Sequence, residues 1–162
     1  MSAKILAIDP GFDRLGMAVL GSEKDKATLL FSDCIVTKKG DVHSERLLAI
    51  GSRVREIIEE WKPVSLAIET LFFNQNTTSA LAVAEARGVV LYEASRAGLS
   101  VYEYSPQAIK IAVTGYGKAD KLQVENMVRK LIKIPIQKTK MLDDELDAIA
   151  VGITYLATQM GI

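Results

Sequence analysis

Cysteine and histidine are nearly absent from the sequence, which has one of each, Cys34 and His43, in 162 residues. A lone cysteine excludes an intramolecular disulfide, and the lack of a cysteine pair excludes a thiolate zinc site. This usage fits a reducing compartment. Cys34 is most simply a small apolar strand residue, and His43, between Asp41 and Ser44 at the start of a predicted helix, is most simply a surface residue.

An excess of either charge is also absent, because 20 Lys and Arg residues balance 20 Asp and Glu residues to a formal net charge of zero. A uniformly basic nucleic-acid coat protein is therefore excluded. Any anionic partner has to be met by local clusters of charge, since there is no overall positive field to attract it.

Long hydrophobic runs are missing as well. Even the alanine-rich stretch 79–97 carries four charged side chains, so no segment is suited to span a membrane. The apolar run 5–8 is too short for a secretory signal and is followed by Asp9. We expect a cytoplasmic protein without membrane contact. Its 49% hydrophobic residues and the lack of a disordered linker predict a single domain over residues 1–162.

Hydrophobic periodicity predicts a series of strands and helices. Strands are expected at 5–8, 16–21, 27–37, 64–69 and 99–104, and helices at 44–61, 78–97, 106–113, 119–132 and 144–160. The first three strands are joined by short turns and form an antiparallel meander, whereas the later ones are joined through helices, which makes them parallel. The predicted fold is therefore α/β, with a five-stranded mixed sheet flanked by helices.

Acidic residues stand at the ends of two predicted strands and at the start of the last predicted helix. Asp9 ends the first strand, Glu69 ends the fourth, and Asp143, Asp144 and Asp147 belong to a run of four acids in five residues. Each has a structural explanation on its own. Asp-Pro-Gly is a common turn, a Glu can close a strand, and acids in the first turn of a helix stabilise its dipole.

Together these acids favour a metal site. On a helix Asp144 and Asp147 share a face, as do Asp143 and Asp147. If the first and fourth strands are neighbours, Asp9 and Glu69 meet at the sheet edge where α/β proteins bind ligands. Converging carboxylates repel one another unless a cation neutralises them, and oxygen ligands alone select Mg²⁺ or Mn²⁺. Such a site favours a phosphodiester or nucleotide substrate, and two ions can assist an in-line displacement.

Five motifs in register along the chain resemble those of the bacterial RuvC-type Holliday junction resolvases. They are Ile8-Asp9-Pro10-Gly11, Ala67-Ile68-Glu69-Thr70-Leu71-Phe72, Ser79-Ala80-Leu81 with Ala86-Arg87-Gly88-Val89, Gly115-Tyr116-Gly117-Lys118-Ala119-Asp120-Lys121, and Asp144-Glu145-Leu146-Asp147-Ala148 with Ala150. The resemblance spans essentially the whole chain. It implies a ribonuclease-H-like fold and a homodimeric, Mg²⁺-dependent endodeoxyribonuclease that cuts two strands of a four-way DNA junction symmetrically, in homologous recombination and DNA repair.

By this resemblance Asp9, Glu69, Asp144 and Asp147 are the catalytic metal ligands. Asp144 is preferred because the family's last two acids stand three residues apart, and Asp143 is kept as the alternative. The implied cofactor is Mg²⁺, two ions per subunit, with Mn²⁺ as a substitute. The implied chemistry is attack of metal-activated water on phosphorus, which leaves 5′-phosphate and 3′-hydroxyl ends and needs no protein nucleophile.

Basic residues cluster in the segment 104–140, which has eight Lys and Arg against two Asp and Glu, a net charge of +6. Such a run is suited to bind phosphates, although solvated helix faces explain most of the individual lysines equally well. The resemblance places Lys110 and Lys121 at basic positions that face DNA near the active site. Lys118 is a weaker candidate for the same role, because the family varies there.

Phe72 and Phe73 shortly follow Glu69 and precede a polar loop, where the burial of two aromatic rings is difficult. An aromatic ring beside unpaired or distorted DNA can stack on a base, and the resemblance assigns that role to Phe72. Packing in the core or in a dimer is the competing explanation, stronger for Phe73 than for Phe72. Both are candidate DNA-binding residues.

The predicted helix 78–97 is apolar nearly all round, so a one-sided contact with its own sheet would leave apolar surface exposed. A second copy of the chain is the expected partner, because two symmetric cuts in a two-fold junction call for two related active sites. The resemblance further implies cooperation with a branch-migration complex of RuvA-type and RuvB-type proteins.

Three rival functions fit parts of the sequence. An actin-like phosphotransferase begins with a similar strand and Asp-containing turn, but it needs two such domains and leaves Glu69 and the last acids without a role. A ribonuclease-H-like nuclease that acts on RNA would use the same carboxylates. A catalytically silent junction-binding dimer leaves unexplained why so many acids lie beside a polyanion.

Overall fold

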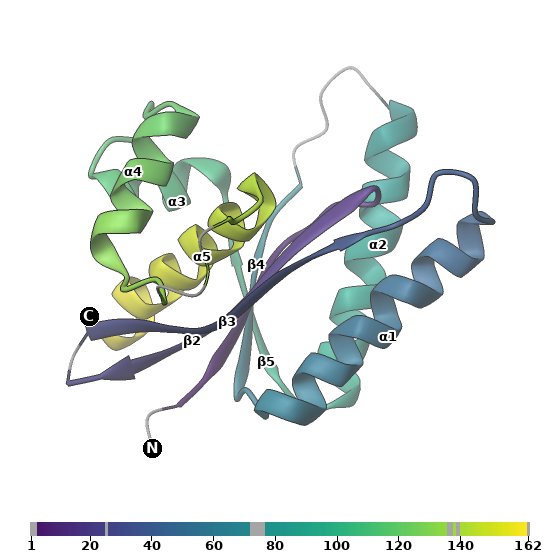
Figure 1. Ribbon diagram of the computed structural model, residues 1–162, viewed down its shortest axis with the longest axis horizontal. Helices are drawn as coiled ribbons and strands as arrows, with labels where there is room; N and C mark the ends of the chain where they lie inside the picture. The colour runs from purple at the N-terminus through teal and green to yellow at the C-terminus, as the bar shows by residue number, and fades with distance from the viewer. Residues whose placement is uncertain (1–2, 25, 72–76, 136–137, 139, 162) are drawn as a thin grey trace.

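The computed structural model describes residues 3–24, 26–71, 77–135, 138 and 140–161. A five-stranded sheet with the order β3-β2-β1-β4-β5 runs through the molecule (Figure 1). Its strands are β1 (Ile5–Asp9), β2 (Arg14–Glu23), β3 (Lys26–Val36), β4 (Ser65–Glu69) and β5 (Ser100–Tyr104). The flanking helices of the described chain are α1 (His43–Trp61), α2 (Thr77–Arg96), α3 (Pro106–Thr114), α4 (Lys121–Leu131), α5 (Asp143–Tyr155) and the π-helical η1 (Leu156–Met160).

The strand pairing confirms the predicted mixed sheet. Strands β1, β2 and β3 form an antiparallel meander, and β1, β4 and β5 pair in parallel. Strands β2 and β3 pair from Arg14 with Val36 to Glu23 with Lys26, so β2 extends beyond the apolar run on which its prediction rested. The last helix is α-helical only to Tyr155, and the rest of its predicted length is η1.

Helices cover both faces of the sheet, α1 and α2 on one side and α3, α4 and α5 on the other (Figure 1). The side chains of β1 alternate between the two layers, as a period of two requires. Leu6 and Ile8 pack into the core under α1 and α2, whereas Ile5 and Ala7 pack into the core that includes α5. All four are fully buried. Strand β1 is thus buried on both faces, which fixes the position of the residue at its end.

The start of α5 lies directly against β2. A Cβ atom on Gly16 would lie 1.9 Å from the carbonyl oxygen of Asp144, so only glycine permits this approach. Gly16 also pairs with Asp9 across the β1–β2 hairpin. The close contact therefore brings the first turn of α5 beside the carboxyl end of β1.

Capping side chains fix the starts of α3 and α4. The Ser105 hydroxyl accepts a hydrogen bond from the N–H of Ala108 at 3.1 Å and so caps α3. Asp120 and Gln123 form a reciprocal capping box, at 2.8 and 2.9 Å, around the first turn of α4. Lys121, the first residue of α4, is consequently held at a defined place.

The two rare residues lie on the surface or near it. Cys34 is a free, partly exposed residue of β3. His43 is exposed at the start of α1, with its Nε2 atom 2.7 Å from a carboxylate oxygen of Glu85. Within the described part of the chain, no helix combines the length and the apolar character that a membrane span needs.

Candidate active site

Asp9 and Glu69 lie at the ends of neighbouring strands. β1 and β4 are parallel, with Ile8 paired to Ile68, so the next residue of each strand emerges at the same edge of the sheet. The predicted meeting of Asp9 and Glu69 requires β1 and β4 to be neighbours, and they are.

The first turns of α5 bring further acids to this edge. The carboxylate of Asp144 lies 2.7 Å from the guanidinium of Arg14 on β2, and that of Asp147 lies 3.6 Å from the ammonium of Lys121 on α4. The side chain of Asp143 is 68% exposed, against 23% for Asp144 and 31% for Asp147. Asp143 therefore points mainly to solvent, while the other two acids turn inward.

We call Asp9, Glu69, Asp144 and Asp147 the carboxylate cluster, because their charges act on one another. Burial, together with the charges of the other three acids, raises the pKa of Asp9 to about 8. Burial and the charge of Asp147 raise the pKa of Glu69 to about 7. Burial also raises the pKa of Asp147, and Lys121 opposes that rise. Acids that resist ionisation through desolvation and repulsion are stabilised in the charged form by a bound cation.

Two lysines accompany the cluster. Glu69, Asp147, Lys110 and Lys121 are among the residues that line a hollow of about 220 Å³ beside α3, α4 and α5. The charge of Lys110 lowers the pKa of Glu69, and that of Lys121 lowers the pKa of Asp147. Positive charge therefore lies next to the acids, where an anionic substrate would otherwise meet only repulsion.

Of the remaining DNA-binding candidates, the structure describes only Lys118. Lys118 is exposed in the turn between α3 and α4 and is not among the lining residues. Phe72 and Phe73 lie outside the described residues.

The side chains of the carboxylate cluster offer only carboxylate oxygens, which are suitable ligands for a hard divalent cation. They do not yet surround one point: over the described ranges, no three Asp, Glu, His or Cys side chains gather closely enough to hold a metal ion. Arg14 and Lys121 instead occupy one side of Asp144 and Asp147. Coordination of a cation would require these two carboxylates to turn from their basic partners toward the strand ends.

Arg14, which forms an ion pair with Asp144, was not among the residues predicted from the sequence. Its place on the β1–β2 hairpin could have indicated a position near the site. Arg14 and Gly16 share one face of β2, and Gly16 is the strand partner of Asp9. The ion pair itself joins residues that are far apart in the sequence, so no local pattern marks it.

The chain matches the family model described as crossover junction endodeoxyribonuclease RuvC over residues 5–155, a range that includes the whole carboxylate cluster. The crossover junction endodeoxyribonuclease RuvC of Moorella thermoacetica is 41% identical over 151 residues, which cover 93% of this chain and 89% of that protein. The RuvC protein of Petrotoga mobilis is 40% identical over 151 residues, which cover 93% and 91% of the two chains.

Solved structures agree with these matches. T. thermophilus RuvC in complex with a Holliday junction substrate has a TM-score of 0.89 and 32% identity, over 98% of this chain and 96% of that chain. The yeast mitochondrial Holliday junction resolvase Ydc2 has a TM-score of 0.71 at 14% identity, over 99% and 81% of the two chains, which is a likeness of fold alone. The ribonuclease-H-like fold implied by the motifs is thereby confirmed.

Proposed function

The chain belongs to the RuvC family of crossover junction endodeoxyribonucleases, and we propose from this membership that it resolves four-way DNA junctions in homologous recombination and repair. Resolution would consist of paired symmetric cuts in two strands that leave 5′-phosphate and 3′-hydroxyl ends. The observation that carries the proposal is the carboxylate cluster, which lies at one sheet edge inside the range of the family match.

Asp9, Glu69, Asp144 and Asp147 would hold Mg²⁺, two ions in each subunit, with Mn²⁺ as a substitute. When bound, the metal would supply an activated water and charge stabilisation at the phosphate that is cut. The chain itself contributes the rigid strand ends that fix Asp9 and Glu69, and the first turns of α5 that carry the other two ligands. Asp143, exposed and paired with Lys121, is not needed as a ligand.

DNA would be bound through the basic segment 104–140. Lys110 and Lys121 would contact the DNA near the active site. Their position in the lining of the same hollow as Glu69 and Asp147 supports this role. Lys118, Phe72 and Phe73 are proposed as additional contacts, the lysine to the backbone and the phenylalanines to unstacked bases.

A homodimer would provide the two active sites that two symmetric cuts need. Each chain would contribute one nuclease domain, and the dimer would act in the cytoplasm with a branch-migration complex of RuvA-type and RuvB-type proteins.

The test is a cleavage assay on a labelled four-way junction, a linear DNA duplex and an RNA–DNA hybrid, each with Mg²⁺ or with EDTA. We expect paired symmetric nicks in the junction alone, and only with Mg²⁺. Asp9→Asn and Asp147→Asn should abolish cleavage while the junction is still bound. Cleavage of the hybrid would instead indicate a nuclease acting on RNA, and binding without cleavage would contradict the proposed mechanism.

A further inference from the structure

A buried carboxylate lies between two members of the carboxylate cluster and has no part in the chemistry above. Glu145 is the third residue of α5, directly after Asp144 and two residues before Asp147. It is only 5% exposed. A buried acid needs partners for its oxygens, and here the partners come from β3 and from the segment that precedes α5.

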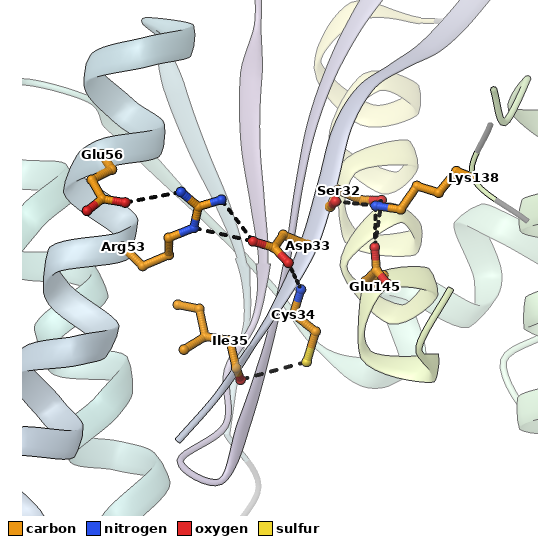
Figure 2. Close-up of polar contacts among 8 residues, drawn as sticks. All are labelled: Ser32, Asp33, Cys34, Ile35, Arg53, Glu56, Lys138 and Glu145. Atoms are coloured by element: carbon orange, nitrogen blue, oxygen red, sulfur yellow. Dashed lines mark hydrogen bonds and ion pairs between the residues drawn. The ribbon is translucent and has the colours of Figure 1, made fainter. Parts of the chain in front are cut away.

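Ser32 and Lys138 both contact the carboxylate of Glu145 (Figure 2). The hydroxyl of Ser32 on β3 donates to Oε1 at 3.0 Å, and the ammonium of Lys138 forms an ion pair with the same oxygen. The N–H of Leu142, just before α5, donates to Oε2 at 2.9 Å. Lys138 also donates to the carbonyl and hydroxyl oxygens of Ser32. Strand β3, the segment before α5 and the start of α5 are thus tied together at one carboxylate.

Overall stability is a poor explanation for such an arrangement. Desolvation offsets most of the attraction in a buried ion pair, and an apolar replacement is often as stable. What a fully hydrogen-bonded buried pair does supply is a defined geometry. In an α-helix each residue advances by about 100° around the axis, so holding Glu145 toward β3 also sets the directions of Asp144 and Asp147.

A second contact restrains the same turn from β2. The backbone of Asp144 lies so close to Gly16 that no Cβ atom fits between them. The link to β3 fixes the rotation of α5, and the contact at Gly16 fixes its distance from the sheet. Neither contact uses a carboxylate oxygen of the carboxylate cluster.

We propose that Glu145, held by Ser32 and Lys138, is a positioning residue for the first turn of α5. It keeps this turn beside the strand ends of Asp9 and Glu69, so that the carboxylates of Asp144 and Asp147 can reach a shared cation by a turn of their side chains alone. The proposal rests on the proposed function, because it presumes that the carboxylate cluster holds a divalent cation. Loss of Glu145 lets the first turn of α5 rotate, and the cluster then binds a cation more weakly while the DNA-binding lysines stay in place.

The test uses the full chain and measures metal binding in the absence of DNA. Electron paramagnetic resonance gives the concentration of free Mn²⁺, and the affinity follows from it. We expect Glu145→Ala to weaken Mn²⁺ binding by roughly 10- to 100-fold, the range typical for residues that orient metal ligands. Affinity for the four-way junction in EDTA should stay unchanged. Ser32→Ala removes the hydroxyl's hydrogen bonds to Glu145 and from Lys138 but leaves the Lys138–Glu145 ion pair, so it should weaken Mn²⁺ binding in the same direction but less.

Glu93 offers a matched control. It is also a buried carboxylate, 4% exposed, and it pairs with Arg55 and Arg96 under α1 and α2, on the other face of the sheet. Glu93→Ala should lower the unfolding temperature and leave the Mn²⁺ affinity of the folded protein unchanged.

Three results would overturn the positioning role. They are a Glu145→Ala protein with wild-type Mn²⁺ affinity, an equal loss of affinity in Glu93→Ala, and, if Glu145→Ala fails to fold, a Ser32→Ala protein with wild-type affinity. Failure of the proposed function looks different, because the wild-type chain itself would then bind no Mn²⁺ or leave the junction uncut.

Discussion

The ammonium of Lys121 lies 3.6 Å from the carboxylate of Asp147, at the point where the first turn of α4 faces α5. The capping box of Asp120 and Gln123 holds the backbone of that turn, so the side chain of Lys121 starts from a defined place at the edge of the carboxylate cluster. It keeps the pKa of Asp147 lower than burial alone would set it. This one side chain therefore links the acids to the surface where phosphate would lie.

Replacing Lys121 by Gln should affect both acid ionisation and DNA binding. The pKa of Asp147 should rise, so the pH at which junction cleavage is half-maximal should move upward. Loss of one phosphate contact should weaken junction binding and lower the slope of log affinity against log salt by about 1. Single-turnover cleavage across pH and a salt titration of binding measure the two effects. Lys118→Gln is the control, and a pH shift of equal size in that variant would contradict the assignment.

The stability of the metal-free protein should fall as pH rises from about 4 to about 8. The pKa of Asp9 is raised from 3.8 to about 8 in the folded state, so between these values the folded protein binds more protons than the unfolded chain. Raising the pH removes protons that favour folding, and Glu69, whose pKa is raised to about 7, acts in the same sense. Urea unfolding in EDTA at several pH values measures the slope.

A variant and an added metal ion test whether the carboxylate cluster causes this pH dependence. Asp9→Asn removes the main titrating group and should flatten the decline. Mn²⁺ should restore stability most strongly near pH 8, because the cation competes with protons for the same oxygens. Stability in EDTA that stays level or increases from pH 5 to pH 8 would show that the acids are not coupled in the way described.

Gly16→Ala should damage the site without touching any acid. The new Cβ atom would meet the carbonyl oxygen of Asp144 at 1.9 Å, so α5 must move away from β2. We expect a loss of about 1–3 kcal/mol in the free energy of unfolding, the usual cost of overpacking, together with weaker cleavage. Gly40→Ala is the control, since a Cβ atom there meets nothing within 4 Å. Wild-type cleavage by Gly16→Ala would show that the close approach is unimportant.

Much of this site could be predicted from the sequence, because the patterns that mark its acidic residues are local. Apolar runs that end in Asp9 and Glu69 mark two strand ends, and the pairing of β1 with β4 then places them together. The three-residue spacing of Asp144 and Asp147 fixes their common face in the same local way. Ranges 5–9 and 65–69 could therefore be predicted almost to the residue.

The contacts that position these acids could not be predicted in that way. Ser32 and Glu145 are separated by 113 residues, and neither lies in a pattern that marks a partner. Arg14 reaches Asp144 only because α5 lies against β2, which depends on the packing of the whole layer. The acidic residues of the site could thus be predicted from short segments, whereas their arrangement in space depends on long-range contacts.

The outer face of α2 should form the interface between two copies of the chain. Leu81 and Tyr92 are 62% and 64% exposed, and eleven residues make three helical turns, so both lie on one side of α2. Gly88 lies between them on that side, with open space where a Cβ atom would stand, which allows close approach of another helix. An exposed apolar stripe with a small residue at its centre is suited to helix–helix contact.

The double variant Leu81→Glu, Tyr92→Glu should therefore change a dimer into a monomer, because two carboxylates per chain would face their symmetry mates across the axis. Light scattering at micromolar concentration measures the mass. Leu122→Glu is the matched control, since Leu122 is 65% exposed on α4 and that variant should remain a dimer. The monomer should nick the junction in one strand rather than in symmetric pairs. A wild-type chain that is already monomeric would contradict the dimer. A double variant that stays dimeric would show that the interface lies elsewhere than on α2.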